Sequence, residues 1–121
     1  MKIIQRHEFL TLPAGTVYAK YESFGNLQEL CIKQESLEDD WFYIPLVSVE
    51  SNSSEAFADI ITEAETSSSF EFQSDSSCVN RDGLFKKGDQ FVVFSRGDVV
   101  LMVEALSGAI ERMTGKDLRV F

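Results

Sequence analysis

The sequence has few of the residues on which catalytic and metal sites most often depend. Its 121 residues include one histidine, two cysteines, two prolines and one tryptophan. The two cysteines, Cys31 and Cys78, form no C-x-x-C pair, so the sequence indicates neither a zinc site nor a disulfide framework. Cys31 lies between two apolar residues of an expected strand and is predicted to be a reduced, buried thiol. No nucleophile motif accompanies His7, the only histidine, so we expect no catalytic residue, no metal site and no cofactor.

A long hydrophobic run is also missing. The most apolar stretch, residues 91–106, is interrupted by Arg96, Asp98 and Glu104, so we expect no membrane span. Residues 1–7 carry charge before any long apolar segment, so we expect no secretory signal peptide. We therefore expect a cytoplasmic protein.

Basic residues are scarce, and one region of the chain has almost none. The chain has 20 acidic and 11 basic residues and a net charge of −9. Between Glu29 and Asp75 there are twelve acidic residues and one basic residue, Lys33. A region of this charge repels phosphates, so direct binding of DNA or RNA is not expected. A protein partner with a basic surface suits it better.

We predict that the acidic residues form a partner-binding face. The expected members of this face are Glu35, Glu38, Asp39, Asp40, Glu55, Asp59 and Glu63. The first four lie in a predicted loop, and the last three recur at four-residue steps along a predicted helix. Like charges at this spacing oppose each other, so helix formation alone gives no reason to collect them. The alternative is that the same residues only keep the loop and helix solvated.

One basic cluster offers an alternative ligand site. It consists of Arg81, Lys86 and Lys87. The segment Gly83–Gly88 around it has the glycine spacing of a phosphate-binding loop. However, Asp89 and Gln90 stand where that loop requires lysine and serine or threonine, so a nucleoside triphosphate site is not indicated.

Periodicity predicts most of the secondary structure. A short helix is expected over residues 6–10, and alternating apolar residues predict strands over residues 16–22 and 29–34. A third strand is expected over residues 41–49, where Pro45 favours an edge or bulged position. An acidic helix is expected to follow the run of N-cap residues Ser51-Asn52-Ser53-Ser54. Residues 73–88 have the least regular pattern.

The strongest periodic signal is a strand that leads directly into a helix, between Gln90 and Gly115. Phe91 to Phe94 form an apolar run, and Ser95-Arg96-Gly97-Asp98 matches a capping box. Apolar residues then recur at steps of three and four, at Val99, Met102, Val103, Leu106, Ala109, Ile110 and Met113. This pattern predicts a helix whose apolar face packs on the sheet.

Together these elements predict a single α+β domain over residues 1–121. With 44% hydrophobic residues, a chain of this length can bury its own core. We expect a mostly antiparallel sheet of about four to six strands, packed against the C-terminal amphipathic helix. The acidic helix and the short N-terminal helix complete it, and residues 118–121 are predicted to add a short final strand.

Two segments resemble a known group of proteins. These segments are Arg6-His7-Glu8-Phe9-Leu10 with the following Leu12–Tyr21, and Asn80-Arg81-Asp82-Gly83-Leu84-Phe85 ahead of an apolar strand. They are similar to small proteins encoded by tailed bacteriophages and prophages, over the first fifth and last third of the chain. The resemblance implies a phage origin and action on or inside a bacterial cell. It transfers no catalytic residue.

Three functional classes remain open on this basis. The favoured one is a non-enzymatic accessory protein that docks on a host or phage protein, and in its sharpest form imitates nucleic acid to inhibit a nucleic-acid-binding or defence protein. The alternative is a protein that binds a small molecule or nucleotide signal, for which a preformed pocket with convergent polar groups is needed. A small hydrolase is less favoured than either. The oligomeric state is left open, and a homodimer is compatible with the sequence.

Overall fold

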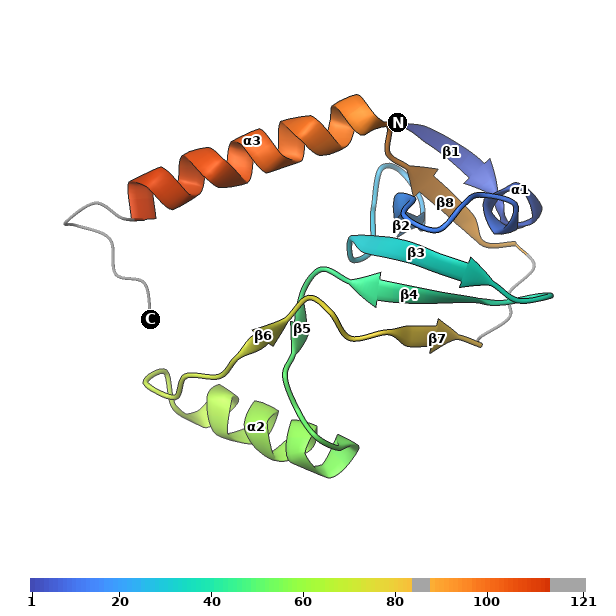
Figure 1. Cartoon of the computed structure of the whole chain (residues 1–121). Helices are drawn as coiled ribbons and strands as arrows, with labels where there is room; N and C mark the ends of the chain where they lie inside the picture. Colours follow the sequence, from blue (N-terminus) through green and yellow to red (C-terminus); the bar gives the residue numbers. More distant parts are fainter. Residues whose placement is uncertain (84–87, 114–121) are drawn as a thin grey trace.

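The fold is built on a six-stranded antiparallel sheet (Figure 1). The computed structural model describes residues 1–83 and 88–113. Its elements are β1 (Lys2–Gln5), α1 (Arg6–Leu10), β2 (Val17–Tyr21), β3 (Cys31–Ser36), β4 (Trp41–Pro45), β5 (Ser48–Val49), α2 (Ser54–Thr66), β6 (Ser74–Asp75), β7 (Asn80–Asp82), β8 (Gln90–Val93) and α3 (Arg96–Met113). The strand order is β1-β8-β2-β3-β4-β7, and β5 pairs with β6 in a separate two-stranded ladder.

The predicted α+β class and antiparallel sheet are confirmed. Two of its strands, β1 and β7, lie in segments for which no strand was predicted. Pro45 was expected at an edge or bulged position, but β4 lies between β3 and β7, and the register shift in its pairing with β3 lies between Lys33 and Ser36. The proline is tolerated because it is the last residue of β4, paired with Cys31 at the end of the ladder. The predicted strand at residues 118–121 lies outside the described residues.

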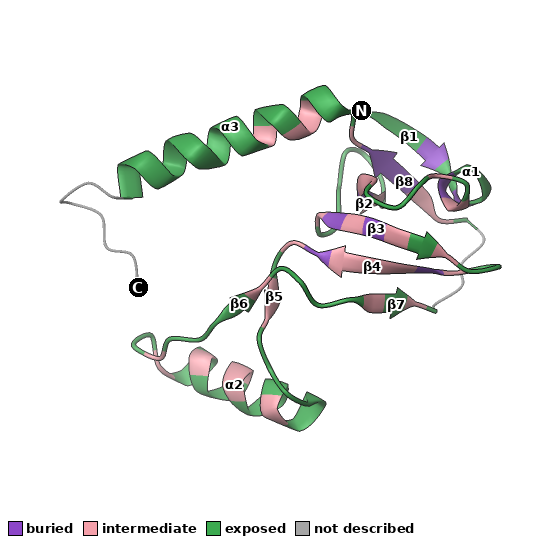
Figure 2. Ribbon diagram, viewed as in Figure 1, coloured by how far each residue is buried: buried purple, intermediate pink, exposed green. Residues whose placement is uncertain are grey.

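The core lies between α1 and one face of the sheet. Four aromatic rings meet there, from Phe9 on α1, Tyr18 on β2, Trp41 on β4 and Phe91 on β8. Phe9 and Phe91 stack with ring centroids 4.1 Å apart, whereas Tyr18 and Trp41 meet Phe9 edge-on at 4.6 and 5.0 Å. Figure 2 shows that the buried residues gather on α1 and the central strands. We call these four residues the aromatic cluster.

Two buried cations tie the loops to this aromatic cluster. The Lys33 ammonium donates hydrogen bonds to the backbone oxygens of Leu12 at 2.8 Å and Gln34 at 3.1 Å, and it lies 5.8 Å from the centre of the Phe9 ring. Burial lowers the pKa of Lys33, because the charged form loses its hydration. On the other side, the Arg6 guanidinium lies 5.0 Å from the Trp41 ring centre. It also donates to the backbone oxygen of Asp39, so it fastens the β3–β4 loop to α1.

Helix α3 begins as the sequence predicts. Asp98 accepts a hydrogen bond from the Ser95 backbone N–H at 2.8 Å, and the Ser95 hydroxyl accepts one from the Asp98 backbone N–H at 3.1 Å, which completes the capping box. The N-terminal ammonium of Met1 lies 2.7 Å from the same carboxylate. These contacts lower the pKa of Asp98 to about 2, with the interaction with the Met1 ammonium as the largest cause.

The expected packing of α3 on the sheet is wrong. Beyond its first turn, α3 projects from the sheet and lies along no other described element (Figure 1). Val103, Leu106, Ile110 and Met113 are all exposed, and no residue of the helix is buried. The aromatic cluster is closed by α1 on one face of the sheet, so the apolar face of α3 is not needed to complete it.

We expect the stability of the fold to depend on Phe9, the side chain that contacts the other three rings of the aromatic cluster. Because Phe9 is fully buried among three rings, Phe9→Ala is expected to lower the free energy of unfolding by about 3–5 kcal/mol. Phe24 is 100% exposed, so Phe24→Ala provides a matched control with an expected change below about 0.5 kcal/mol. Chemical denaturation measures both. A loss below about 1 kcal/mol for Phe9→Ala would contradict this account of the core.

Candidate functional site

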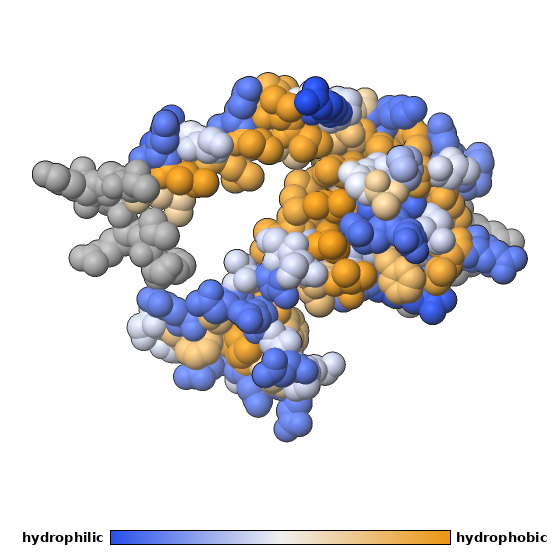
Figure 3. Space-filling model, viewed as in Figure 1, coloured by the Kyte–Doolittle hydropathy of each residue, from blue (hydrophilic) through white to orange (hydrophobic). Residues whose placement is uncertain are grey.

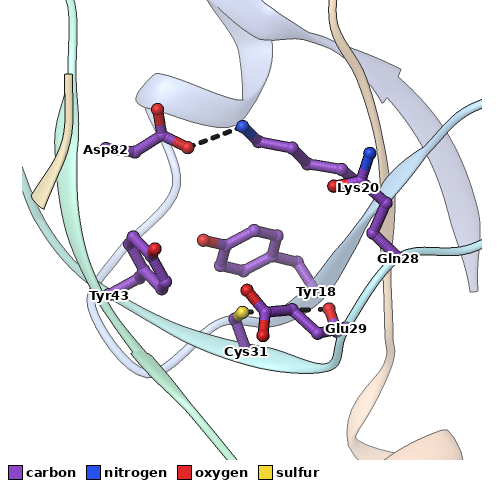
Figure 4. A pocket seen from close by; sticks show the side chains of 7 residues that line it. All are labelled: Tyr18, Lys20, Gln28, Glu29, Cys31, Tyr43 and Asp82. Carbon is purple, nitrogen blue, oxygen red and sulfur yellow. Dashed lines mark hydrogen bonds and ion pairs between the residues drawn. The ribbon is translucent and has the colours of Figure 1, made fainter. Parts of the chain in front are cut away.

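A small polar pocket opens on the cluster side of the sheet, beyond Tyr18 (Figure 4). Its volume is about 60 Å³, and it is lined by Tyr18, Lys20, Gln28, Glu29, Cys31, Tyr43 and Asp82. These side chains converge because strands β2, β3 and β4 each place alternate residues on this face, and β7 adds Asp82 at its end. Gln28 and Glu29 come from the β2–β3 connection.

Short polar contacts hold the pocket in shape. Lys20 Nζ lies 2.6 Å from Asp82 Oδ2, which links β2 to β7 across two intervening strands. Trp41 Nε1 donates a hydrogen bond of 2.8 Å to the Tyr18 hydroxyl, so the pocket floor is continuous with the aromatic cluster. The Lys20 ammonium also lies 5.6 Å from the Trp41 ring centre. The pocket is therefore built directly on the buried core of the fold.

The protonation states in this pocket do not favour nucleophilic chemistry. Burial, and then the nearby Glu29 carboxylate, raise the pKa of the Cys31 thiol to about 12. Burial likewise raises the pKa values of Tyr18 and Tyr43. At neutral pH these three groups stay protonated and uncharged, whereas nucleophilic catalysis requires a thiolate. The pocket can hold water or a small polar group, but it is well below the 300 Å³ or so of a typical cofactor site.

No local pattern in the sequence indicates this pocket. Tyr18 and Lys20 fall in the strand predicted over residues 16–22, and Asp82 falls in residues 73–88, which have the least regular pattern. The alternation of residues along the strands does place these side chains on one face of the sheet. Tyr18 and Lys20 share that face with Cys31 on β3 and with Tyr43 on β4. The strand order needed to align them was not available from the sequence.

The acidic residues 35–40 lie at the β3–β4 hairpin. Glu35 is an exposed residue near the end of β3, whereas Glu38, Asp39 and Asp40 lie in the connection to β4. Asp40 Oδ2 accepts a hydrogen bond of 2.7 Å from Arg81 Nε, so part of this charge is neutralised by β7. The backbone of Asp39 is held by Arg6. This hairpin therefore has clear structural contacts of its own.

The acidic residues of α2 lie elsewhere. Glu55, Asp59 and Glu63 are all exposed along one edge of the helix. The β3–β4 connection precedes β4 and α2 follows it, so the length of β4, about 17 Å, separates the two groups (Figure 1). The structure thus divides the seven expected residues into two acidic surfaces, and it does not bring them together as one face. We call the group of Glu55, Asp59 and Glu63 the α2 acidic edge.

The alternative basic site is only partly described. Arg81 lies beside a hollow that Leu37, Glu38, Asp39, Asp40 and Gly83 also line, so acidic rather than basic groups surround it. Lys86 and Lys87 lie outside the described residues. Among residues 1–83 and 88–113, the structure therefore places Arg81, on β7, beside the acidic residues of the β3–β4 hairpin.

No protein-family model, curated protein or solved structure matches this chain. In the part of the chain that the structure describes, the helices are too short or too polar to cross a membrane. The same residues bring together no group of three or more histidine, cysteine or acidic side chains that could hold a metal ion.

The two cysteines are expected to differ sharply in reactivity. Cys78 is exposed, whereas Cys31 is buried and its pKa of about 12 leaves almost no thiolate at pH 8 or so. A thiol-reactive disulfide reagent should titrate one thiol in the folded protein and two after denaturation. Cys78→Ser should remove the fast reaction only. Two rapidly reacting thiols in the folded protein would contradict the placement of Cys31.

Proposed function

We propose that this protein is a non-enzymatic interaction protein that binds a basic surface of a protein partner through the α2 acidic edge. The supporting observation is the position of α2. It stands beyond the six-stranded sheet on the short β5–β6 ladder (Figure 1). The residues of its acidic edge are all exposed. The apolar side of α2 instead faces its own unit, where Ala56 and Ile60 line a groove with Phe70 and Phe72.

The charge of α2 is not explained by helix stability. The helix contains four acidic residues and no basic one. Glu55 lies in the first turn, where a negative charge is favourable, but Glu63 and Glu65 lie near the C-terminus, where the helix dipole opposes negative charge. The N-terminus is already capped by the Ser53 hydroxyl, which accepts from the Ala56 backbone N–H at 3.1 Å. A binding role accounts for acidic residues on α2 that the stability of the helix does not require.

The geometry of the α2 acidic edge suits a groove that binds nucleic acid. Residues four apart on a helix are separated by about 6 Å along the axis, so the three carboxylates form a row of like charges about 12 Å long. A basic groove built for a phosphate backbone attracts such a row and speeds encounter with it. The proposed partner is a host or phage protein in a bacterial cell, and the proposed outcome is inhibition of a nucleic-acid-binding or defence protein.

The observed pocket does not favour a nucleotide-binding function. At about 60 Å³ it is too small for a nucleotide, and its one ammonium group, that of Lys20, is paired with Asp82. Arg81, from the alternative basic site, is paired with Asp40. Among the described residues, the α2 acidic edge is the better supported binding surface.

Charge reversal on α2 tests the proposed function. The Asp59→Lys/Glu63→Lys variant is used as bait against a bacterial lysate, beside the wild-type protein and the matched control Glu35→Lys/Glu38→Lys on the hairpin. Proteins bound by the wild type at about 50 mM salt should be lost from the α2 variant and kept by the control, because the charge attraction is local. Their binding to the wild type should weaken as salt is raised.

Quantitative mass spectrometry of the captured proteins gives the readout. Both substituted pairs consist of exposed residues, so the fold should be retained in each variant, which circular dichroism checks. If the α2 variant and the wild type capture the same proteins in the same amounts at both salt levels, the α2 acidic edge is not the binding surface.

A further inference from the structure

The exposed apolar residues of α3 form one continuous stripe. Val99, Val103, Leu106, Ile110 and Met113 follow each other at steps of four, three, four and three residues, which keeps them on one side of the helix. Figure 3 shows apolar side chains along α3 and on the side of the sheet that faces the open hollow beside the helix. We call these five residues the α3 stripe. Within the described chain, nothing covers the last four of them.

Helix α3 gains little packing from the rest of the described chain. It has 18 residues, only a little more than the length of about 12–15 residues below which isolated helices are marginal in water, and most helical stability in proteins comes from packing of an apolar face. Beyond the capping box and the Met1–Asp98 contact at its start, its described residues gain little from packing. An apolar stripe of this length on an unsupported helix indicates that a second surface packs on it.

The residues of the stripe favour a second copy of a helix. With Val103 and Ile110 in the a positions of a heptad, Leu106 and Met113 fall in the d positions. In parallel helix pairs, β-branched residues at a with leucine at d favour two-stranded association. Leu106 is the leucine in this pattern, and Val99 and Met113 occupy the other d positions. The stripe extends for only about two heptads, so the helix pair requires additional contact area.

The charge distribution also favours self-association over the basic partner that suits α2. Two copies of a chain with net charge −9 repel each other. This repulsion is weakest when the surfaces that come into contact contain no charged residues. The α3 stripe contains no charged residue, and Asp98, Glu104 and Glu111 lie outside it. Two identical stripes can therefore approach without placing like charges in contact.

The adjoining face of the sheet supplies further apolar surface. A groove of about 500 Å³ lies there, lined mainly by Met1, Ile3, Tyr21, Leu27 and Val92. The Met1–Asp98 ion pair places this groove beside the start of α3. Helix α3 is about 27 Å long, so a strip about 10 Å wide offers on the order of 300 Å² of projected surface. A stable dimer requires about 800 Å² per partner, so the interface must include the groove as well as the stripe.

We propose that two copies of this chain form a symmetric dimer in which the α3 stripe and the adjoining sheet groove of each copy pack against the other copy. This interface is separate from the α2 acidic edge, which stays open to its own partner. The dimer would present two α2 helices, one from each copy.

A pair of leucines on α3 allows a matched test. Leu106 lies in the stripe and is 64% exposed, whereas Leu101 lies about 140° away around the helix and is 65% exposed. The substitutions Leu106→Lys and Leu101→Lys therefore change the same residue type, at the same exposure, on different sides of one helix. Molecular mass is measured by light scattering after size exclusion at about 50 µM protein.

The wild type and Leu101→Lys should show twice the monomer mass of 13.6 kDa, and Leu106→Lys should show the monomer mass. Fluorescence of the buried Trp41 checks that the sheet is folded in each variant. A wild-type protein that is monomeric at this concentration would overturn the proposal. The stripe would then be covered by another segment of the chain or by another molecule. A dimer that survives Leu106→Lys, or is lost equally in both folded variants, would overturn it as well.

Discussion

The contact between Phe9 and the three rings around it is the interaction on which the rest of the structure depends. It joins the N-terminal α1 to β2, β4 and β8, which are distant from one another in the sequence. Each aromatic pair adds about 0.5–1.5 kcal/mol to the burial of its apolar area. The same cluster fixes Lys33 and Arg6, because both cations lie against its rings while they hold the backbone of Leu12 and Asp39.

The position of this core explains which surfaces remain free. Since α1 closes the aromatic cluster on one face of the sheet, neither longer helix is needed to complete it. Helix α2 stands on the β5–β6 ladder, and α3 extends from the end of β8. The molecule therefore presents two surfaces of different chemistry: an acidic edge that suits a basic partner, and an apolar stripe that suits a second copy.

Local patterns in the sequence were sufficient for most of the individual elements. The capping box at Ser95 and Asp98 and the N-cap at Ser53 both form with the expected hydrogen bonds. Strand β1 was missed because four residues, Lys2 to Gln5, are too few to show a period, and β8 imposes their conformation by pairing. The polar β7 was missed for the same reason, since its pairing with β4 rather than its own composition makes it a strand.

The sequence could not show what each surface contacts. The spacing of Leu106 and Ile110 predicts an apolar helix face, but periodicity is the same whether that face meets its own sheet or another chain. The pocket at Tyr18 and Asp82 required a strand order in which β7 joins β4, and no local pattern contains that information. The two groups of acidic residues lie apart for a similar reason, because β4 lies between them.

Hydrogen–deuterium exchange, measured by mass spectrometry at low and high protein concentration, tests most directly whether the aromatic cluster holds the sheet while α3 is supported from outside. We expect strong, concentration-independent protection of β2, β4 and β8, and protection of α3 that rises with protein concentration. Protection of α3 equal to that of β8 at every concentration would contradict it, because the helix would then be part of the chain's own core. Weak protection of α3 at every concentration would contradict the dimer.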